Sequence, residues 1–149
     1  MTELESEHAD AVAVAYVHDG DQVMYSFHHS MLQLLDHDVH NEARIWRGGH
    51  ISMRAATDGL AAARNTAVKE FLSGNAQWLW WVGTDMGFGP DVVDRLMEAA
   101  DPVQRPVVGA LCFANREVDN DGMGGRRALA APVIMHWTHD GEEAGFDTR

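Results

Sequence analysis

Cysteine is nearly absent from this sequence, since Cys112 is the only one among 149 residues. A single cysteine excludes an internal disulfide framework and a four-cysteine zinc site. Basic residues are also scarce: 11 Lys and Arg stand against 23 Asp and Glu, which gives a formal charge of −12. An acidic surface repels phosphate backbones, so we expect no nucleic-acid partner. Long apolar runs are missing too, because the central run at residues 78–82 is far too short to span a bilayer.

The sequence does have the composition of an ordinary globular domain. Apolar residues make up 46% of the chain and charged residues 23%, a balance that disordered proteins lack. One domain is the default at this length, so we expect an acidic lead-in over residues 1–10 and a single domain over residues 11–149. The lead-in has no charged and then apolar leader pattern, which predicts a soluble, cytoplasmic protein.

Apolar runs predict the strands. Continuous runs bounded by turn residues are typical of strands that are buried on both faces of a parallel sheet. Such runs occupy residues 11–17, 78–82 and 106–113, with a less certain strand within 44–53 and one more at 131–137. Residues 115–131 are rich in glycine and charge, which predicts a loop there.

Helical periodicity fills the gaps between these strands. An apolar stripe follows Asp21, and either Asp19 or Asp21 is available as the N-cap. The clearest helix is predicted over residues 57–72 with Thr57 as its cap, and another opens at Pro90. This alternation of strands and helices predicts an α/β fold with three layers, α/β/α, around a mostly parallel sheet.

Polar residues follow three of the predicted strands. In parallel sheets, ligands bind at the edge where the strands present their carboxyl ends. The turns concerned contain His18–Asp19, Gly83–Asp85 and Asn115–Arg116. We therefore expect a ligand site to be built from these turns.

Arg64 interrupts the apolar face of the predicted helix. At about 100° per residue it falls between Leu60 and Val68, near the middle of the apolar side. A buried guanidinium needs an anionic partner, because an unpaired buried charge is costly. The alternatives are a structural acid, a stem that reaches out to water, or a ligand phosphate, which the planar guanidinium matches well.

Asp85 lies in the short turn that follows the apolar run at residues 78–82. An exposed turn aspartate is one interpretation. The other is a ligand for a hard divalent cation, which prefers carboxylate oxygens and leaves positions for substrate phosphates. In the same run, side-chain alternation places Trp78 and Trp80 on one face and Trp81 on the other. Core packing explains these tryptophans better than stacking on a sugar.

Two stretches together carry a family resemblance: LAAARN at residues 60–65 and WLWWVGTDMGFGPDVVDRLMEA at residues 78–99. The chain resembles inverting glycosyltransferases of the GT-A fold, in particular short family-2-like members of bacteria and actinobacterial phages. The resemblance covers about residues 11–137, with its pieces in the family's order. It implies that this chain transfers a sugar from a nucleotide-diphosphate sugar donor to an acceptor, which the sequence does not identify.

The resemblance also implies roles for individual residues. The nucleotide base would lie near His18 and Asp19, and Arg64 with Asn65 would contact the nucleotide or its diphosphate. The turn with Thr84 and Asp85 matches the family's Asp-x-Asp motif, in which the second acid, here Asp85, binds Mn²⁺ or Mg²⁺ on the diphosphate. His136 would be an additional metal ligand, as a late histidine often is in these enzymes.

Two features depart from the family pattern. Gly83 stands where the first acid of the Asp-x-Asp motif is usual. The sequence also stops soon after the last predicted strand, so we expect the acceptor part and the catalytic base to be missing. The alternative function is therefore a non-catalytic, truncated or degenerate relative that binds a sugar nucleotide and works through a partner chain. A sheet with an open edge would also favour a homo-oligomer.

Overall fold

The computed structural model describes residues 10–20, 22–55, 57–120, 125–132, 134–135 and 146–147, with side chains up to residue 112. Contacts within the chain divide it into two compact units, Met1–Pro106 and Val107–Arg149. Each unit is described by itself.

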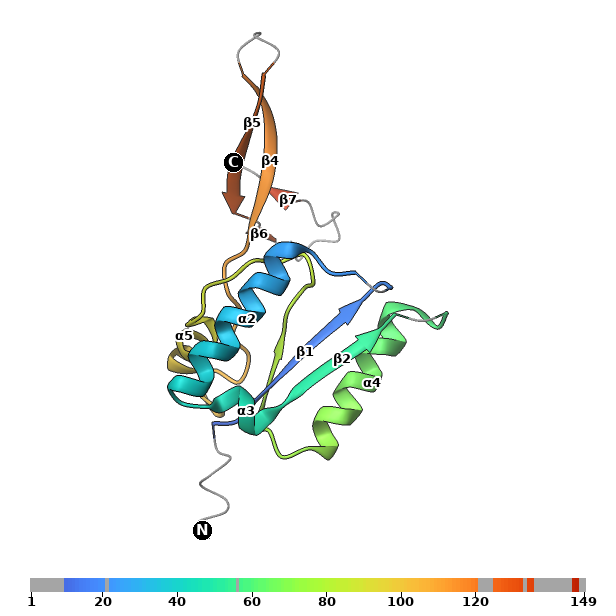
Figure 1. The fold of residues 1–149 in the computed structure, drawn as a ribbon, viewed down its shortest axis with the longest axis vertical. Coiled ribbons are helices and arrows are strands. Elements are labelled where there is room, and N and C mark those ends of the chain that lie inside the picture. Colours follow the sequence, from blue (N-terminus) through green and yellow to red (C-terminus); the bar gives the residue numbers. More distant parts are fainter. Residues whose placement is uncertain are drawn as a thin grey trace, which may run out of the picture. The chain divides into compact units, whose positions relative to one another are not determined.

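The first unit is built on a parallel sheet of three strands (Figure 1). These are β1 (Val12–His18), β2 (His50–Arg54) and β3 (Trp78–Trp81), in the order β2-β1-β3. In the register, Val14 faces His50 on one side and Trp80 on the other. The predicted α/β class and the parallel strands at the first and third positions are confirmed.

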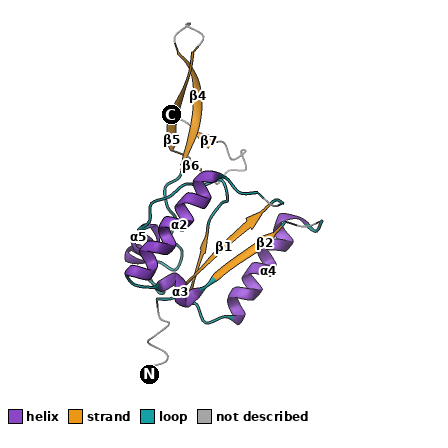
Figure 2. Cartoon of the chain, viewed as in Figure 1, coloured by secondary structure: helices purple, strands orange, loops and turns teal. Residues whose placement is uncertain are grey.

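Four helices connect and cover these strands (Figure 2). Their bounds are α2 Tyr25–His40, α3 Arg44–Gly48, α4 Gly59–Ser73 and α5 Val92–Ala99. The strand expected within residues 44–53 is confirmed as β2. The sequence also indicated α2, α4 and α5, but not α3, which occupies the first half of that region. Gly49 explains that error, because its φ of 80° ends the helix with a sharp change of direction before β2 begins.

The predicted helix caps are wrong where the structure describes them. The N-cap of α2 is Met24 and that of α4 is Asp58, and neither makes a side-chain cap hydrogen bond. The backbone N–H of Met24 instead donates to the carbonyl oxygen of Thr84 at 3.1 Å. A tertiary contact thus takes the place of a local cap and ties α2 to the turn after β3.

Alternate residues of the strands face two separate apolar clusters. One face of the sheet packs against α2, α3 and α5, and the other packs against α4. The buried members are Val12, Val14, Phe27, Met31, Leu34, Ile45 and Val93 in the first cluster, and Ala13, Ala15, Ile51 and Ala67 in the second. The second cluster contains small side chains, so α4 lies close to the sheet.

A buried carboxylate lies near the amino end of the sheet. Asp38 near the end of α2 is only 6% exposed and accepts hydrogen bonds from the backbone N–H groups of Ile45 and Trp46, both at 3.0 Å. Here α3 also approaches β1 closely, since a Cβ atom at Gly48 would lie 2.2 Å from the Val12 carbonyl oxygen. Only glycine fits at that position.

Further charges at the amino end are paired with one another. Asp94 of α5 accepts from His37 Nε2 at 2.8 Å, and its other oxygen lies 3.4 Å from Arg44 Nε. The same guanidinium lies 3.4 Å from Asp10. These ion pairs connect α2, α3 and α5.

The described residues of the second unit include antiparallel pairs of strands. β4 (Phe113–Asn120) pairs with β5 (Gly125–Pro132), and β6 (Ile134–Met135) pairs with β7 (Phe146–Asp147). Two predictions are therefore wrong: most of the expected loop at 115–131 is β4 and β5, and the expected buried strand at 106–113 has no regular structure up to residue 112. Val107 in that stretch is 89% exposed, so its apolar run is not a buried strand.

Among the described residues, the longest apolar helical stretch falls short of what crossing a membrane requires.

Candidate functional site

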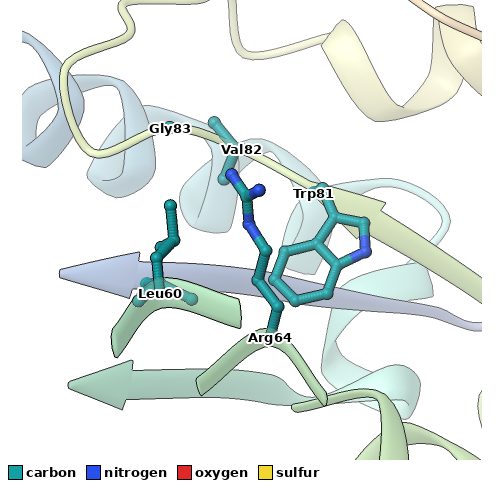
Figure 3. A pocket seen from close by; sticks show the side chains of 6 residues that line it. Leu60, Arg64, Trp81, Val82 and Gly83 are labelled. Atoms are coloured by element: carbon teal, nitrogen blue, oxygen red, sulfur yellow. The ribbon is translucent and has the colours of Figure 1, made fainter. Parts of the chain in front are cut away.

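A cleft of about 440 Å³ lies at the carboxyl end of the parallel sheet (Figure 3). Its walls come from β1, from the start of α4, and from the end of β3 with the residues that follow. The lining residues are Val17, Leu60, Arg64, Trp81, Val82 and Gly83. The cleft exists because α4 packs mainly on β2 and β1, which leaves the end of β3 uncovered.

Arg64 extends from α4 into this cleft and toward Val82 (Figure 3). The prediction that it lies in the middle of a buried face is wrong, because its side chain is exposed. The face of α4 that meets the sheet is centred between Ala63 and Ala67, and Arg64 lies about 80° away from that line at 100° per residue. Small alanines, rather than the larger Leu60, make the closest approach.

The guanidinium of Arg64 has no hydrogen bond or ion pair with any described residue. The structural salt bridge that the sequence left open is therefore not found in the part of the chain that the structure describes. An exposed, unpaired cation on the wall of a cleft remains free to contact an anionic ligand.

The three tryptophans of β3 have different surroundings. Trp78 and Trp80 pack against the first apolar cluster, as expected, and the ring of Trp80 meets that of Phe88 edge to face at a centroid distance of 5.1 Å. Trp81 points to the other face, which confirms the predicted alternation. It belongs to neither cluster and is 38% exposed, so core packing is the wrong interpretation for this residue.

Asp85 lies on the turn that follows β3, and its side chain is exposed. It does not line the cleft itself. A Cβ atom at Gly83, however, would lie 2.6 Å from Asp85 Oδ1. The carboxylate of Asp85 therefore lies beside Gly83, which lines the cleft, on the same edge of the sheet as Arg64.

The turn that carries Asp85 is anchored on both sides. The carbonyl of Thr84 accepts from Met24, as described above, and the backbone N–H of Phe88 donates to Ser30 Oγ at 3.0 Å. Ser30 is itself only 6% exposed. These contacts fix the turn against α2 and hold Asp85 near the cleft.

The remaining predicted site residues lie outside the cleft lining. His18 is half-buried at the end of β1, and its Nδ1 hydrogen-bonds to the carbonyl of Gly20, whose φ is 93°. Asp19 and Asn65 are exposed. His136 falls outside the described residues.

At this edge of the sheet, Asp85 is the carboxylate that the family resemblance assigns to a divalent cation. None of their His, Cys, Asp and Glu side chains form a group of three or more that could hold a metal ion. Mg²⁺ is commonly bound through one or two carboxylates, with water and substrate phosphates as the other ligands. The exposed Asp85 fits that kind of site, and the described residues do not form a closed structural metal site.

Two groups in the described part of the chain have clearly shifted pKa values, and both lie away from the cleft. Burial lowers the pKa of His50, at the start of β2, and the nearby carboxylate of Asp38 opposes that shift. Backbone N–H groups of Gln104 and Val103 lower the pKa of Asp101. Both shifts follow from local packing and turn geometry.

Comparison with known proteins found no matching family model, no matching curated protein and no matching solved structure. The residues of the two motifs and the geometry of the cleft are therefore the basis for a function.

Proposed function

We propose that the first unit binds a nucleotide-diphosphate sugar in this cleft, with a fold of the GT-A type, and that the protein is a glycosyltransferase. The observation that carries the proposal is the guanidinium of Arg64, which has no ion-pair partner among the described residues and lies on the wall of a cleft at the carboxyl edge of a parallel sheet. Ligands of α/β proteins bind at that edge. Arg64 would contact the diphosphate.

The net charge of the chain favours a site in which both Arg64 and a divalent cation contact the diphosphate. A protein with a formal charge of −12 repels a diphosphate unless the local field is positive. Arg64 supplies one positive charge, and Mn²⁺ or Mg²⁺ on Asp85 would supply more. A bound divalent cation acts as a Lewis acid that stabilises the charge developing on the departing diphosphate. Asp85 is exposed, which leaves room for the phosphate oxygens.

The other residues implied by the family resemblance belong to the periphery of this proposal. Val17 lines the cleft, so its neighbours His18 and Asp19 stand at the border of the space that a nucleotide would occupy. Nδ1 of His18 is engaged by Gly20, which leaves Nε2 to meet a polar edge of the ligand. Asn65 follows Arg64 on α4 and would act as an outer contact.

A second candidate is a protein that binds a sugar nucleotide without transferring the sugar. The composition of the cleft favours this alternative, because the lining residues that the structure describes include no carboxylate and no histidine. A general base for the acceptor hydroxyl is therefore not among them. Gly83 in place of the first acid of the motif points the same way.

Calorimetric titration with UDP-sugars and GDP-sugars in the presence of Mn²⁺ tests the binding site. We expect Arg64→Ala and Asp85→Ala each to weaken binding about tenfold or more, because each removes a charged contact to the diphosphate. Arg47→Ala and Asp36→Ala are matched controls, since both residues are exposed and lie on α3 and α2. Equal binding by the wild type and both site variants would contradict the assignment.

Release of free nucleotide from the donor separates the two candidates. A transferase or donor hydrolase releases nucleoside diphosphate with time, and Asp85→Ala should abolish that release. Tight binding without release, under conditions where the protein is saturated, would favour the non-catalytic alternative.

A further inference from the structure

Trp81 is the one tryptophan of β3 that the core does not use. Its neighbour Trp80 has a ring contact with Phe88, whereas Trp81 has no ring contact with any described residue. It lines the cleft and is 38% exposed. A large aromatic surface is thus available at the place where the ligand would enter.

The described side chains that line the cleft beside Trp81 are apolar apart from Arg64. The cleft contributes Val17, Leu60 and Val82, whose side chains cannot form hydrogen bonds. The hydroxyl groups of a sugar need donors and acceptors when they leave water, and the described side chains here supply donors from Arg64 and the Trp81 indole but no acceptor. The flat face of a nucleobase has no such requirement and stacks well on an indole.

The order of the lining residues at the end of β3 and just after it fits the order of groups in a nucleotide. Trp81 precedes Gly83 by two residues, which is about 6.6 Å along an extended chain. The carboxylate of Asp85 lies against Gly83. Arg64 lines the same cleft from α4. A base at Trp81 therefore leaves the diphosphate within the field of Arg64 and a cation on Asp85.

We infer that Trp81 is the base-stacking residue of the cleft, and that the ligand it takes is a nucleoside diphosphate or its sugar conjugate. This inference rests on the proposed function and assigns the position of the base, which the sequence alone placed only near His18 and Asp19. The two placements are compatible, because Trp81 and Val17 line the same cleft and His18 follows Val17 directly on β1. Stacking is tolerant of base identity, so Trp81 sets affinity more than it selects one base.

The test compares ligands with and without a base. UDP, GDP and inorganic pyrophosphate are each titrated in the presence of Mn²⁺ against the wild type, Trp81→Leu and Trp81→Phe. We expect Trp81→Leu to weaken UDP and GDP binding about tenfold and to leave pyrophosphate binding unchanged, because only the stacking contact is lost. Trp81→Phe should fall between the wild type and Trp81→Leu. Trp46→Leu is the matched control, since Trp46 is 77% exposed on α3.

The outcomes separate the inference from the function on which it rests. Unchanged binding of UDP and GDP by Trp81→Leu would overturn the stacking role while leaving the site intact. An equal loss for pyrophosphate would overturn it as well, because Trp81 would then shape the cleft instead of contacting the base. Selective loss of UDP-sugar binding with UDP binding retained would overturn it too, because it would place the sugar on Trp81.

The proposed function itself has a separate test. It fails if the wild type binds none of these ligands, or if the binding does not depend on Mn²⁺ and is unchanged in Asp85→Ala. Thermal unfolding curves of the variants confirm that the compared proteins are folded.

Discussion

The charged side chains described at the two ends of the parallel sheet differ in whether they have partners within the fold. At the amino end, Asp38 is buried and accepts two backbone hydrogen bonds, and Asp94 is shared between His37 and Arg44. At the carboxyl end, Arg64 and Asp85 are exposed and have no ion-pair partner among the described residues. Charges that are satisfied within the fold stabilise it. Charges left unsatisfied beside a cleft are the ones available to a ligand.

Charges that stabilise the fold can be distinguished from charges available to a ligand by what their removal leaves unpaired. Asp38 cannot be removed without leaving buried N–H groups unpaired, which is costly. Removing Arg64 or Asp85 leaves nothing buried and unpaired. We therefore expect substitutions at the amino end to change stability and substitutions at the carboxyl end to change binding.

The largest effect is expected for Gly48→Ala at the amino end. The added Cβ atom would lie 2.2 Å from the Val12 carbonyl oxygen and 2.8 Å from the Ala13 nitrogen, both of which are backbone atoms that cannot move away. Overpacking of this severity should lower the free energy of unfolding by about 4 kcal/mol or more. Urea denaturation measures the loss. Gly74→Ala is the control, because its nearest neighbour would be at 3.4 Å and its φ is −90°; a comparable loss there would show that glycine replacement in general is the cause.

A smaller loss is expected for Asp38→Ala. This variant deprives the N–H groups of Ile45 and Trp46 of their acceptor, which should lower the free energy of unfolding by about 2–3 kcal/mol. Binding of a nucleotide at the far end of the sheet should not change, provided that the variant is folded at the temperature of the titration. Asp36→Ala on the same helix is the control, because Asp36 is exposed. If Asp38→Ala is as stable as the wild type but binds nucleotide poorly, the proposed contrast between the two ends of the sheet is wrong.

The smallest effect on stability, and the most informative one for the cleft, is expected for Gly83→Asp. The backbone accepts a side chain there because φ of Gly83 is not positive, and the nearest atom is the movable Asp85 Oδ1. Two adjacent carboxylates repel each other, which costs about 1 kcal/mol or less at an exposed site. Mn²⁺ should remove that penalty.

The measurement for Gly83→Asp is the melting temperature with and without Mn²⁺, together with donor binding. We expect Mn²⁺ to raise the melting temperature more in this variant than in the wild type, and metal-dependent donor binding to become stronger. Gly83→Asn has similar size without the charge and should show neither change. Weaker donor binding by Gly83→Asp would mean that the turn is wrongly aligned with the Asp-x-Asp motif.

Much of the first unit could be predicted from local patterns. The runs at residues 11–17 and 78–82 became β1 and β3 because each is apolar throughout and bounded by turn residues. The run at 106–113 has the same pattern and yet contains no strand up to residue 112. A strand exists only where a neighbour supplies hydrogen bonds, and no local pattern encodes that neighbour.

The candidate site was predictable in its location but less so in its details. The carboxyl-edge rule selected the turn with Asp85, and helical spacing selected Arg64. Neither could show that Ala63 and Ala67, and not the larger Leu60, make the closest contact of α4 with the sheet. The same limit applies to Trp81: its face followed from alternation, but its exposure depends on how far α4 extends over β3, which is a tertiary property.

The double attachment of the turn after β3 affects how quickly a ligand could bind. Thr84 and Phe88 are fastened to α2, so the carboxylate between them is carried by a segment that is ordered before any cation arrives. Little chain entropy remains to be lost on association. Capture at this edge would then proceed at a rate limited by diffusion and orientation, without waiting for the backbone to rearrange.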